Sequence, residues 1–318
     1  MMLMNKMVNN IILLFFFLFI SCNSKIKLND NKNFNSSLIN YIPYYLKVYE
    51  ADSLYIVKNY DKCYHILDSL FVNFKPLNTE KYKEYETYIS CAYVLNKKMD
   101  FKREFLKSIE FYGTNPRYIK YDSLLKRAYK ESSITNQEAE EAVKKYRDKL
   151  RFDLRETVKE ICRDDQEIRK GSTVYNEKIN TVDSINQLKL IKIFSENGFP
   201  SEKLIGEFYI DSVNINLRFV FLHTRHDFRL NFLLPKILEE VKKGNAYPEM
   251  YSESYDRYLE EVQGGKQLYG SYKLKRQKEN VEFVNKAKID SIRRSIGLPS
   301  LNYNKWRQKE KYGIVPYN

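Results

Sequence analysis

Apolar residues recur at intervals of three and four over most of the chain, which is the spacing of one face of an α-helix. Between residues 59 and 76 this face consists of Cys63, Ile66, Leu67, Leu70 and Phe71. Pro76 follows at a position where a helix cannot continue. Residues 44–55 supply an earlier helix, so the pattern predicts a helical hairpin.

A second hairpin is predicted over residues 81–113, with its turn at Met99 to Phe101, and a short helix over residues 118–130. The first hairpin resembles a tetratricopeptide repeat. The two turns lie about 41 residues apart, whereas that family repeats every 34 or so. Unrelated helical hairpins therefore remain the alternative for the domain over residues 41–134.

One long helix is predicted from residue 135 to about residue 170. Thr135 and Glu138 have the spacing of a capping box, in which each side chain satisfies a free backbone amide. An apolar stripe then continues past residue 154. We expect residues 135–154 to link the hairpins to a C-terminal domain over residues 155–304, with a tail over residues 305–318.

The C-terminal domain has five further helical patterns, separated by glycine and proline breaks. They cover residues 183–196, 204–226, 231–243, 248–262 and 285–296. The run over residues 208–222 is rich in β-branched and aromatic residues and could be a strand, but its length and apolar spacing favour a helix. The predicted fold is mainly α: N-terminal antiparallel helical hairpins joined by a long helix to an α-helical C-terminal domain.

The N-terminus has the pattern of a secretory signal: Lys6 is the one early charge, and the apolar run over residues 11–20 is too short to span a bilayer, which needs about 20 residues. Because Cys22 follows Ser21, the segment resembles a bacterial lipoprotein signal, with Phe19 in place of the usual Leu. The resemblance implies removal of residues 1–21, a lipid on Cys22 and a tether over residues 22–40. It places the protein in the cell envelope, in the outer membrane if the cell is Gram-negative.

The distribution of charge and the spacing of the cysteines argue against a nucleic-acid-binding protein and against a CxxC-type zinc or redox site. The chain carries a net charge of +13, but Lys and Glu alternate along the predicted helices, which is typical of solvated faces rather than of a nucleic-acid interface. Cys63, Cys91 and Cys162 include no CxxC motif. In an oxidising compartment Cys63 and Cys91 are the pair to expect as a disulfide; the alternative is three buried thiols.

Polar signatures occur in a fixed order through the C-terminal half. They are Asp165-Gln166-x-x-Arg169, Asp183-x-x-Asn186, Gly198-x-Pro200, His223-x-x-His226-Asp227, Asp256-Arg257, Gln267-x-Tyr269-Gly270 and Asp290-x-x-Arg293-Arg294-x-x-Gly297-Leu298. As a set they resemble a bacterial family catalogued as domain of unknown function 6624. The family has no known reaction, so the resemblance implies a domain boundary and a candidate surface.

The resemblance departs most at the family's Q-H-A-D element. His223 matches its histidine, but Leu222 replaces the glutamine and Arg225 replaces the aspartate. Ser271 also stands where the family usually has Thr. An activity that depends on this element would be lost or altered here.

The residue types themselves leave the role of each charged pair open. Asp165 and Arg169 are four residues apart, so on a helix their side chains meet. They could clamp a polar ligand or form a structural ion pair, with Gln166 beside them. Asp256 and Arg257 present the same choice, although neighbouring helical residues point to different sides.

His223, His226 and Asp227 have the spacing of one helical face. Zinc accepts two imidazoles and a carboxylate, but the chain has neither an HExxH motif nor an evident third histidine, so we predict no metal and no cofactor. His223 is instead a candidate catalytic residue for proton transfer, or an ordinary satisfied histidine. Gln267 and Tyr269 could orient a ligand or hold a loop.

Three hypotheses follow from the sequence, and whether the chain is an enzyme stays undecided. The first is a lipid-anchored binding module whose N-terminal helices hold a protein or peptide partner. The second is an envelope hydrolase in which His223 is the general base and Asp165, Arg169, Asp256 and Arg257 surround the substrate. The third is a structural lipoprotein with a buried polar network.

Overall fold

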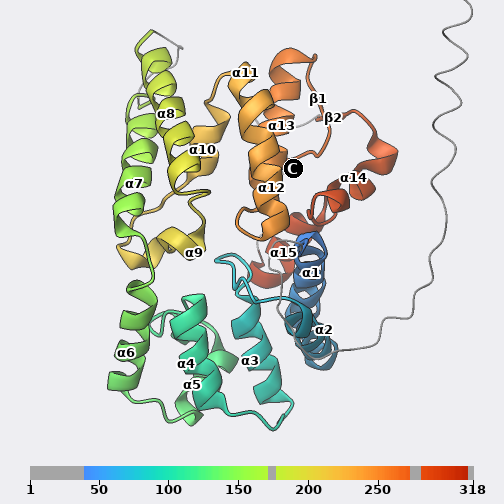
Figure 1. Cartoon of the computed structure of the whole chain (residues 1–318). Helices are drawn as coiled ribbons and strands as arrows, with labels where there is room; N and C mark the ends of the chain where they lie inside the picture. The colour runs from blue at the N-terminus through green and yellow to red at the C-terminus, as the bar shows by residue number, and fades with distance from the viewer. Residues whose placement is uncertain (1–38, 171–176, 273–280, 314–318) are drawn as a thin grey trace, which may run out of the picture. The chain divides into compact units, whose positions relative to one another are not determined.

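The computed structural model describes residues 39–170, 177–272 and 281–313, and these are mainly helical, as predicted (Figure 1). Within those ranges the only strands are β1 (Lys266–Gln267) and β2 (Glu282–Phe283), which pair in parallel. The signal segment, Cys22 and the tether up to residue 38 lie outside the described residues. None of the described helices has the length and hydropathy to cross a membrane.

The N-terminal hairpins form where the sequence predicts them. The helices are α1 (Ile42–Ile56), α2 (Tyr60–Asn73), α3 (Glu84–Val94), α4 (Phe101–Tyr112), the 3-10 turn η2 (Ile119–Tyr121) and α5 (Ser123–Glu131). Side chains of Asn59, Asp100 and Asp122 accept hydrogen bonds from the first free amides of α2, α4 and α5. Consecutive helices pack on one another, α1 on α2 and α2 on α3.

The predicted long helix is two helices, α6 (Asn136–Arg147) and α7 (Phe152–Glu167). The capping box of Thr135 and Glu138 is confirmed at the start of α6. The break follows from tertiary contacts: α6 packs on α4, whereas α7 packs on α8 and α10, and the amide of Arg151 donates to the carbonyl of Leu204 at 2.9 Å. Each helix can thereby lie against its own neighbours.

The C-terminal half continues after α7 as a series of helices and turns, of which α8, α9 and α10 pack on α7. In chain order they are α8 (Glu177–Glu196), α9 (Glu202–Ile205), η3 (Phe208–Ile210), α10 (Leu217–Leu222), α11 (His226–Phe228), the π-helical turn η4 (Arg229–Leu233), α12 (Leu234–Lys243), α13 (Pro248–Val262), η5 (Lys286–Lys288), α14 (Ile289–Ser295) and α15 (Tyr303–Tyr312). The bounds of α13 coincide with the predicted ones. In Figure 1, α7 and α8 run side by side.

The helix predicted over residues 204–226 is wrong, and buried Arg155 of α7 explains why. Its guanidinium donates to the carbonyls of Ile205 (2.8 Å) and Gly206 (2.9 Å) and binds the carboxylate of Asp211 at 2.6 Å. A helix would use those carbonyls internally. Gly206 also has a φ of +76°, which the apolar spacing cannot reveal.

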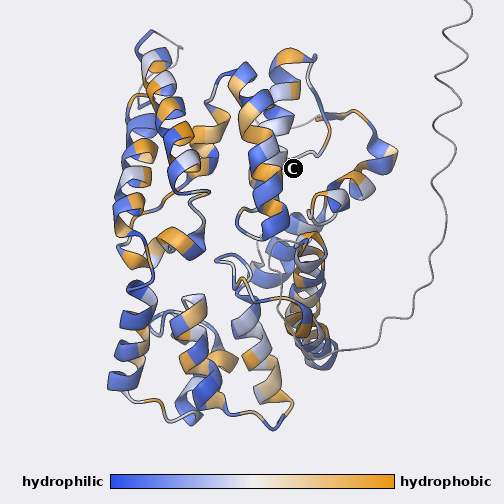
Figure 2. Cartoon of the chain, in the orientation of Figure 1, coloured by the Kyte–Doolittle hydropathy of each residue, from blue (hydrophilic) through white to orange (hydrophobic). Residues whose placement is uncertain are grey.

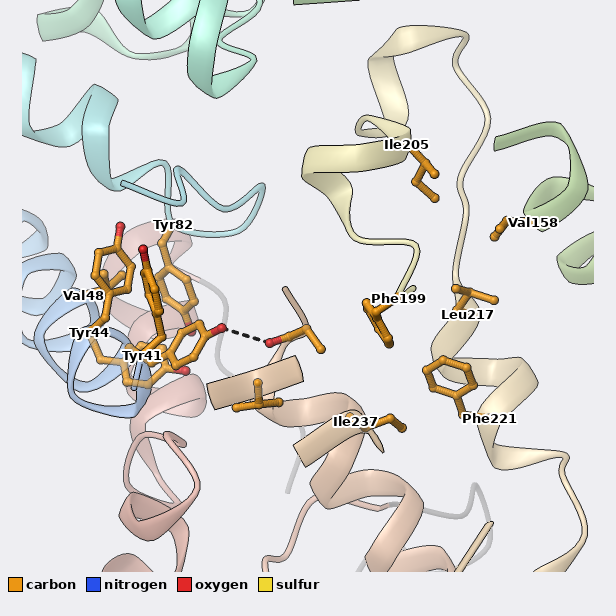
Figure 3. Packing of buried hydrophobic residues seen from close by; sticks show 14 of the residues in the cluster. Tyr41, Tyr44, Val48, Tyr82, Val158, Phe199, Ile205, Leu217, Phe221 and Ile237 are labelled. Carbon is orange, nitrogen blue, oxygen red and sulfur yellow. Dashed lines mark hydrogen bonds between the residues drawn. The ribbon is translucent and has the colours of Figure 1, made fainter. Parts of the chain in front are cut away.

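The largest buried apolar cluster draws on both halves of the described chain. Figure 3 shows Tyr44 and Val48 of α1 in the same cluster as Phe199, Leu217 and Phe221. The hydropathy colouring in Figure 2 shows apolar and polar residues on different sides of many helices, as an amphipathic packing requires.

The first and last described helices are joined by a buried ion pair. Arg307 of α15 donates from Nε to Oδ2 of Asp52 on α1 at 2.7 Å, and the hydroxyl of Tyr303 donates to the same oxygen at 2.5 Å. All three side chains are buried. Cys63 and Cys91 are also buried, as neighbouring free thiols of α2 and α3.

Candidate functional site

The centre of the candidate site is a fully buried carboxylate, that of Asp165 on α7, with a relative exposure of 0%. His223, which ends α10, lies with its Nδ1 2.8 Å from Oδ1 of Asp165. An ionised carboxylate can only accept hydrogen bonds, so it holds the imidazole proton on Nδ1. The pair spans 58 residues and exists because α10 packs on α7.

Arg169 connects this carboxylate to a second one. Its Nη1 donates to Oδ1 of Asp165 at 3.0 Å, and its Nη2 lies 2.6 Å from Oδ1 of Asp183 on α8. Gln166 donates to the other oxygen of Asp165 at 2.6 Å. The carboxylate of Asp165 is therefore saturated by side chains that hold His223 and two helices in place.

His223 opens onto a cleft of about 850 Å³, and its side chain is 20% exposed. The cleft is lined by Arg169, Asp183, His223, Thr224, Arg225, His226, Asp227, Arg229, Arg257 and Glu261. Because Nδ1 faces Asp165, the ring nitrogen left for a ligand is Nε2. Four signature residues, Asp165, Arg169, Asp183 and His223, thus converge at one end of an open cleft.

Arg229 and Glu261 form part of the cleft wall, and neither is among the site residues predicted from the sequence. Arg229 begins the π-helical turn η4 and is 1% exposed. Its Nη1 lies 3.1 Å from Oε2 of Glu261, while Nε of Arg257 donates to Oε1 of Glu261 at 2.8 Å. The four-residue spacing of Arg257 and Glu261 was the available signal for the second pair. No residue near Arg229 in the sequence indicates that it belongs to the site.

The other members of the histidine signature do not share one helical face with His223. His223 ends α10, whereas His226 begins the separate turn α11. Arg225, at the position where the family has an aspartate, donates from Nε to Asp227 at 3.3 Å. In the ranges that the structure describes, no group of three His, Cys, Asp or Glu side chains is placed to hold a metal.

Asp256 faces away from the cleft although its neighbour Arg257 lines it. The buried carboxylate of Asp256 accepts hydrogen bonds from the amides of Leu268 (2.8 Å), Tyr269 (2.9 Å) and Ser271 (2.8 Å). Burial raises the pKa of this carboxyl to about 6, while the three amide donors lower it. Asp256 therefore holds a loop and does not surround a substrate beside His223.

Gln267 and Tyr269 belong to that loop. Gln267 is buried and donates to the carboxylate of Glu260 and to the carbonyl of Tyr272. Tyr269 is buried against the rings of Tyr251 and Tyr255, with centroid distances of 6.0 and 5.9 Å. Both side chains serve packing, and neither lines the cleft of His223.

Asn186, one turn after Asp183 on α8, is 2% exposed, and its amide oxygen and nitrogen have no hydrogen-bond partner among the described residues. A buried amide without partners costs free energy. Packing alone does not explain an amide at this position.

Comparison with protein-family models, curated proteins and solved structures found no match to this chain. Among the residues singled out from the sequence, Arg169, Asp183, His223 and Arg257 line the cleft. Asp256, Gln267 and Tyr269 instead build the loop over residues 267–272.

Proposed function

We propose that the protein is a hydrolase in which His223 acts as the general base. The observation that carries this proposal is the 2.8 Å contact between Nδ1 of His223 and the buried carboxylate of Asp165, at the wall of an open cleft. A base whose second nitrogen is oriented by a third group is the recurrent arrangement for activating a nucleophile.

The proposal gives each residue a role. Nε2 of His223 accepts a proton from water as the water oxygen attacks the substrate, and the imidazolium then returns that proton to the leaving group. Asp165 orients the ring and stabilises the imidazolium. Arg169 is a positioning residue, because it fixes Asp165 relative to α8 through Asp183.

A panel of nitrophenyl substrates would test the proposal: a carboxylic ester, a phosphate monoester, a phosphate diester and a set of glycosides. We expect turnover of at least one class, and we expect His223→Gln to reduce it by about 100-fold or more, because proton transfer is worth about 10²–10⁴ in rate. The matched control is His65→Gln. His65 also lies beside an aspartate, with Nδ1 3.5 Å from Asp61, but it is exposed on α2.

Two results would contradict the proposal. One is no turnover of any class by purified, folded protein. The other is turnover that His223→Gln and His65→Gln reduce equally. Melting temperatures of both variants would show that each remains folded.

A second candidate function is binding of a protein or peptide by the N-terminal helices. Exposed apolar side chains on these elements favour it: Val72 is 77% exposed, and Phe111 and Tyr121 are also exposed. A pull-down with Val72→Lys and Phe111→Lys would test it. A partner set that both variants retain in full would count against this role.

We also propose that the protein is held in the cell envelope by a lipid on Cys22, on the strength of the signal-like N-terminus alone. Metabolic labelling with palmitate should mark the native protein, and Cys22→Ser should abolish the label. Mass spectrometry that finds an unmodified Met1 would rule the anchor out.

A further inference from the structure

Two guanidinium groups share one carboxylate at the wall of the cleft. Arg229 reaches Oε2 of Glu261 at 3.1 Å and Arg257 reaches Oε1 at 2.8 Å. His226 lies 3.6 Å from the same Oε2. One negative charge therefore faces two permanent positive charges, since arginine stays protonated in proteins.

The remaining acids of the cleft are bound elsewhere. Asp183 lies 2.6 Å from Arg169, which also binds Asp165, and Asp227 lies 3.3 Å from Arg225. These acids pair with arginines other than Arg229 and Arg257. The excess positive charge is therefore local to Arg229, Arg257 and Glu261.

Arg229 has an unused donor in a buried position. Its side chain is almost fully buried, and Nε has no hydrogen-bond partner among the described residues, although the residue lines the cleft. Burial and the nearby charge of Arg257 lower the pKa of Arg229. An unpaired buried donor next to a second guanidinium is costly unless an anion completes the group.

Arg229 is also fixed to the turn that carries His223. Its Nη2 donates to the carbonyls of Leu222 and Thr224, each at 2.6 Å, and these are the residues on either side of His223. The guanidinium therefore cannot move away from the imidazole without breaking both bonds. An anion bound by Arg229 would therefore lie close to the turn that carries His223.

We propose that Arg229, Arg257 and Glu261 form a subsite for an oxyanion, either phosphate or carboxylate, carried by the substrate that His223 hydrolyses. Guanidinium groups suit this role because their planar donors match the oxygens of both groups. That the anion belongs to a substrate rests on the proposed hydrolase function. The anion site itself can be measured without turnover.

Calorimetric titration of the full chain with inorganic phosphate, at constant ionic strength, tests the subsite. We expect saturable binding in the millimolar range or tighter, weakened by at least about tenfold in Arg257→Gln and less in Arg257→Lys, which keeps the charge. Glu261→Gln removes the competing carboxylate and should strengthen binding several-fold. The matched control is Arg151→Gln, because Arg151 also pairs with a carboxylate, that of Asp153, but lies outside the cleft.

A parallel titration with acetate identifies the group. Saturable binding of either anion, weakened in Arg257→Gln, supports the subsite; saturable binding of neither overturns it. Equal affinity in folded Arg257→Gln also overturns it, and so does weaker binding in Glu261→Gln. The variant His223→Gln should bind phosphate like the wild type, so a failed hydrolase assay and a failed anion site remain distinguishable.

Discussion

Asp165 and Asp256 are both aspartates on helices with no exposed surface, yet their partners differ in kind. Asp165 receives side chains: an imidazole, a guanidinium and an amide. Asp256 receives three backbone amides of one loop. Only the first carboxylate has a partner that can exchange a proton with something in the cleft.

The difference shows how one residue type serves two purposes in one domain. Backbone amides cannot change their protonation state, so a carboxylate bound to them fixes the chain and does nothing else. A carboxylate bound to histidine sets the tautomer and the orientation of the ring. Buried aspartates are therefore better judged by their donors than by their burial.

The largest expected effect is on stability, at the loop. Asp256→Ala leaves three loop amides, one of them fully buried, without their acceptor. We expect it to lower the free energy of unfolding by about 3–5 kcal/mol in urea titrations. Asp153→Ala, at an exposed pair with Arg151, should lower the free energy of unfolding far less. Similar losses in the two variants would mean that Asp256 does not hold the loop.

The next effect is on rate, at the cleft. Asp165→Asn keeps the shape of the side chain but presents an amide to His223 and favours the wrong tautomer. We expect turnover to fall by about 100-fold while the free energy of unfolding falls by only about 1–2 kcal/mol. If Asp165→Asn lowers stability as much as Asp256→Ala does and leaves the rate unchanged, both aspartates have a purely structural role.

The smallest expected effect is on the pH dependence of stability, through two buried glutamates, Glu202 and Glu207. Burial raises the pKa of Glu202 to about 8 and that of Glu207 to about 7; the hydroxyl of Tyr247 donates to Glu202, and Lys83 lies 2.7 Å from Glu207. The folded state holds these protons more tightly than the unfolded state, so stability must fall as the pH rises from 5 through 8.

We expect the melting temperature to drop by about 3 °C or more over this range, beyond any general charge effect. The variant Glu202→Gln should show a smaller drop, whereas Glu196→Gln, at an exposed position of α8, should follow the wild type. A wild-type melting temperature that rises with pH would contradict the raised pKa values.

The helices of the N-terminal half could be predicted because their signals are local. Asp100 begins α4 and Gly113 ends it in the left-handed conformation, and both residues are visible as turn residues in the sequence. The segment over residues 204–226 could not be predicted in the same way. Its conformation depends on Arg155, which lies about 50 residues earlier and binds carbonyls that a helix would otherwise use.

In the candidate site, too, contacts between residues close in sequence could be predicted, whereas contacts between distant residues could not. The four-residue spacing of Asp165 and Arg169 predicts their contact, and the structure has it at 3.0 Å. The contact of Asp165 with His223 depends on how α10 packs against α7, which no short motif encodes. The buried arginine of η4 was missed for the same reason, since its partners belong to the turn around His223 and to α13.

The ion pair between Asp52 and Arg307 has a consequence for biosynthesis. The ribosome makes the carboxylate about 250 residues before the guanidinium that neutralises it, and burying an unpaired charge is strongly unfavourable. The buried pair, and with it the contact of α1 with α15, can therefore form only after the C-terminal end has been made.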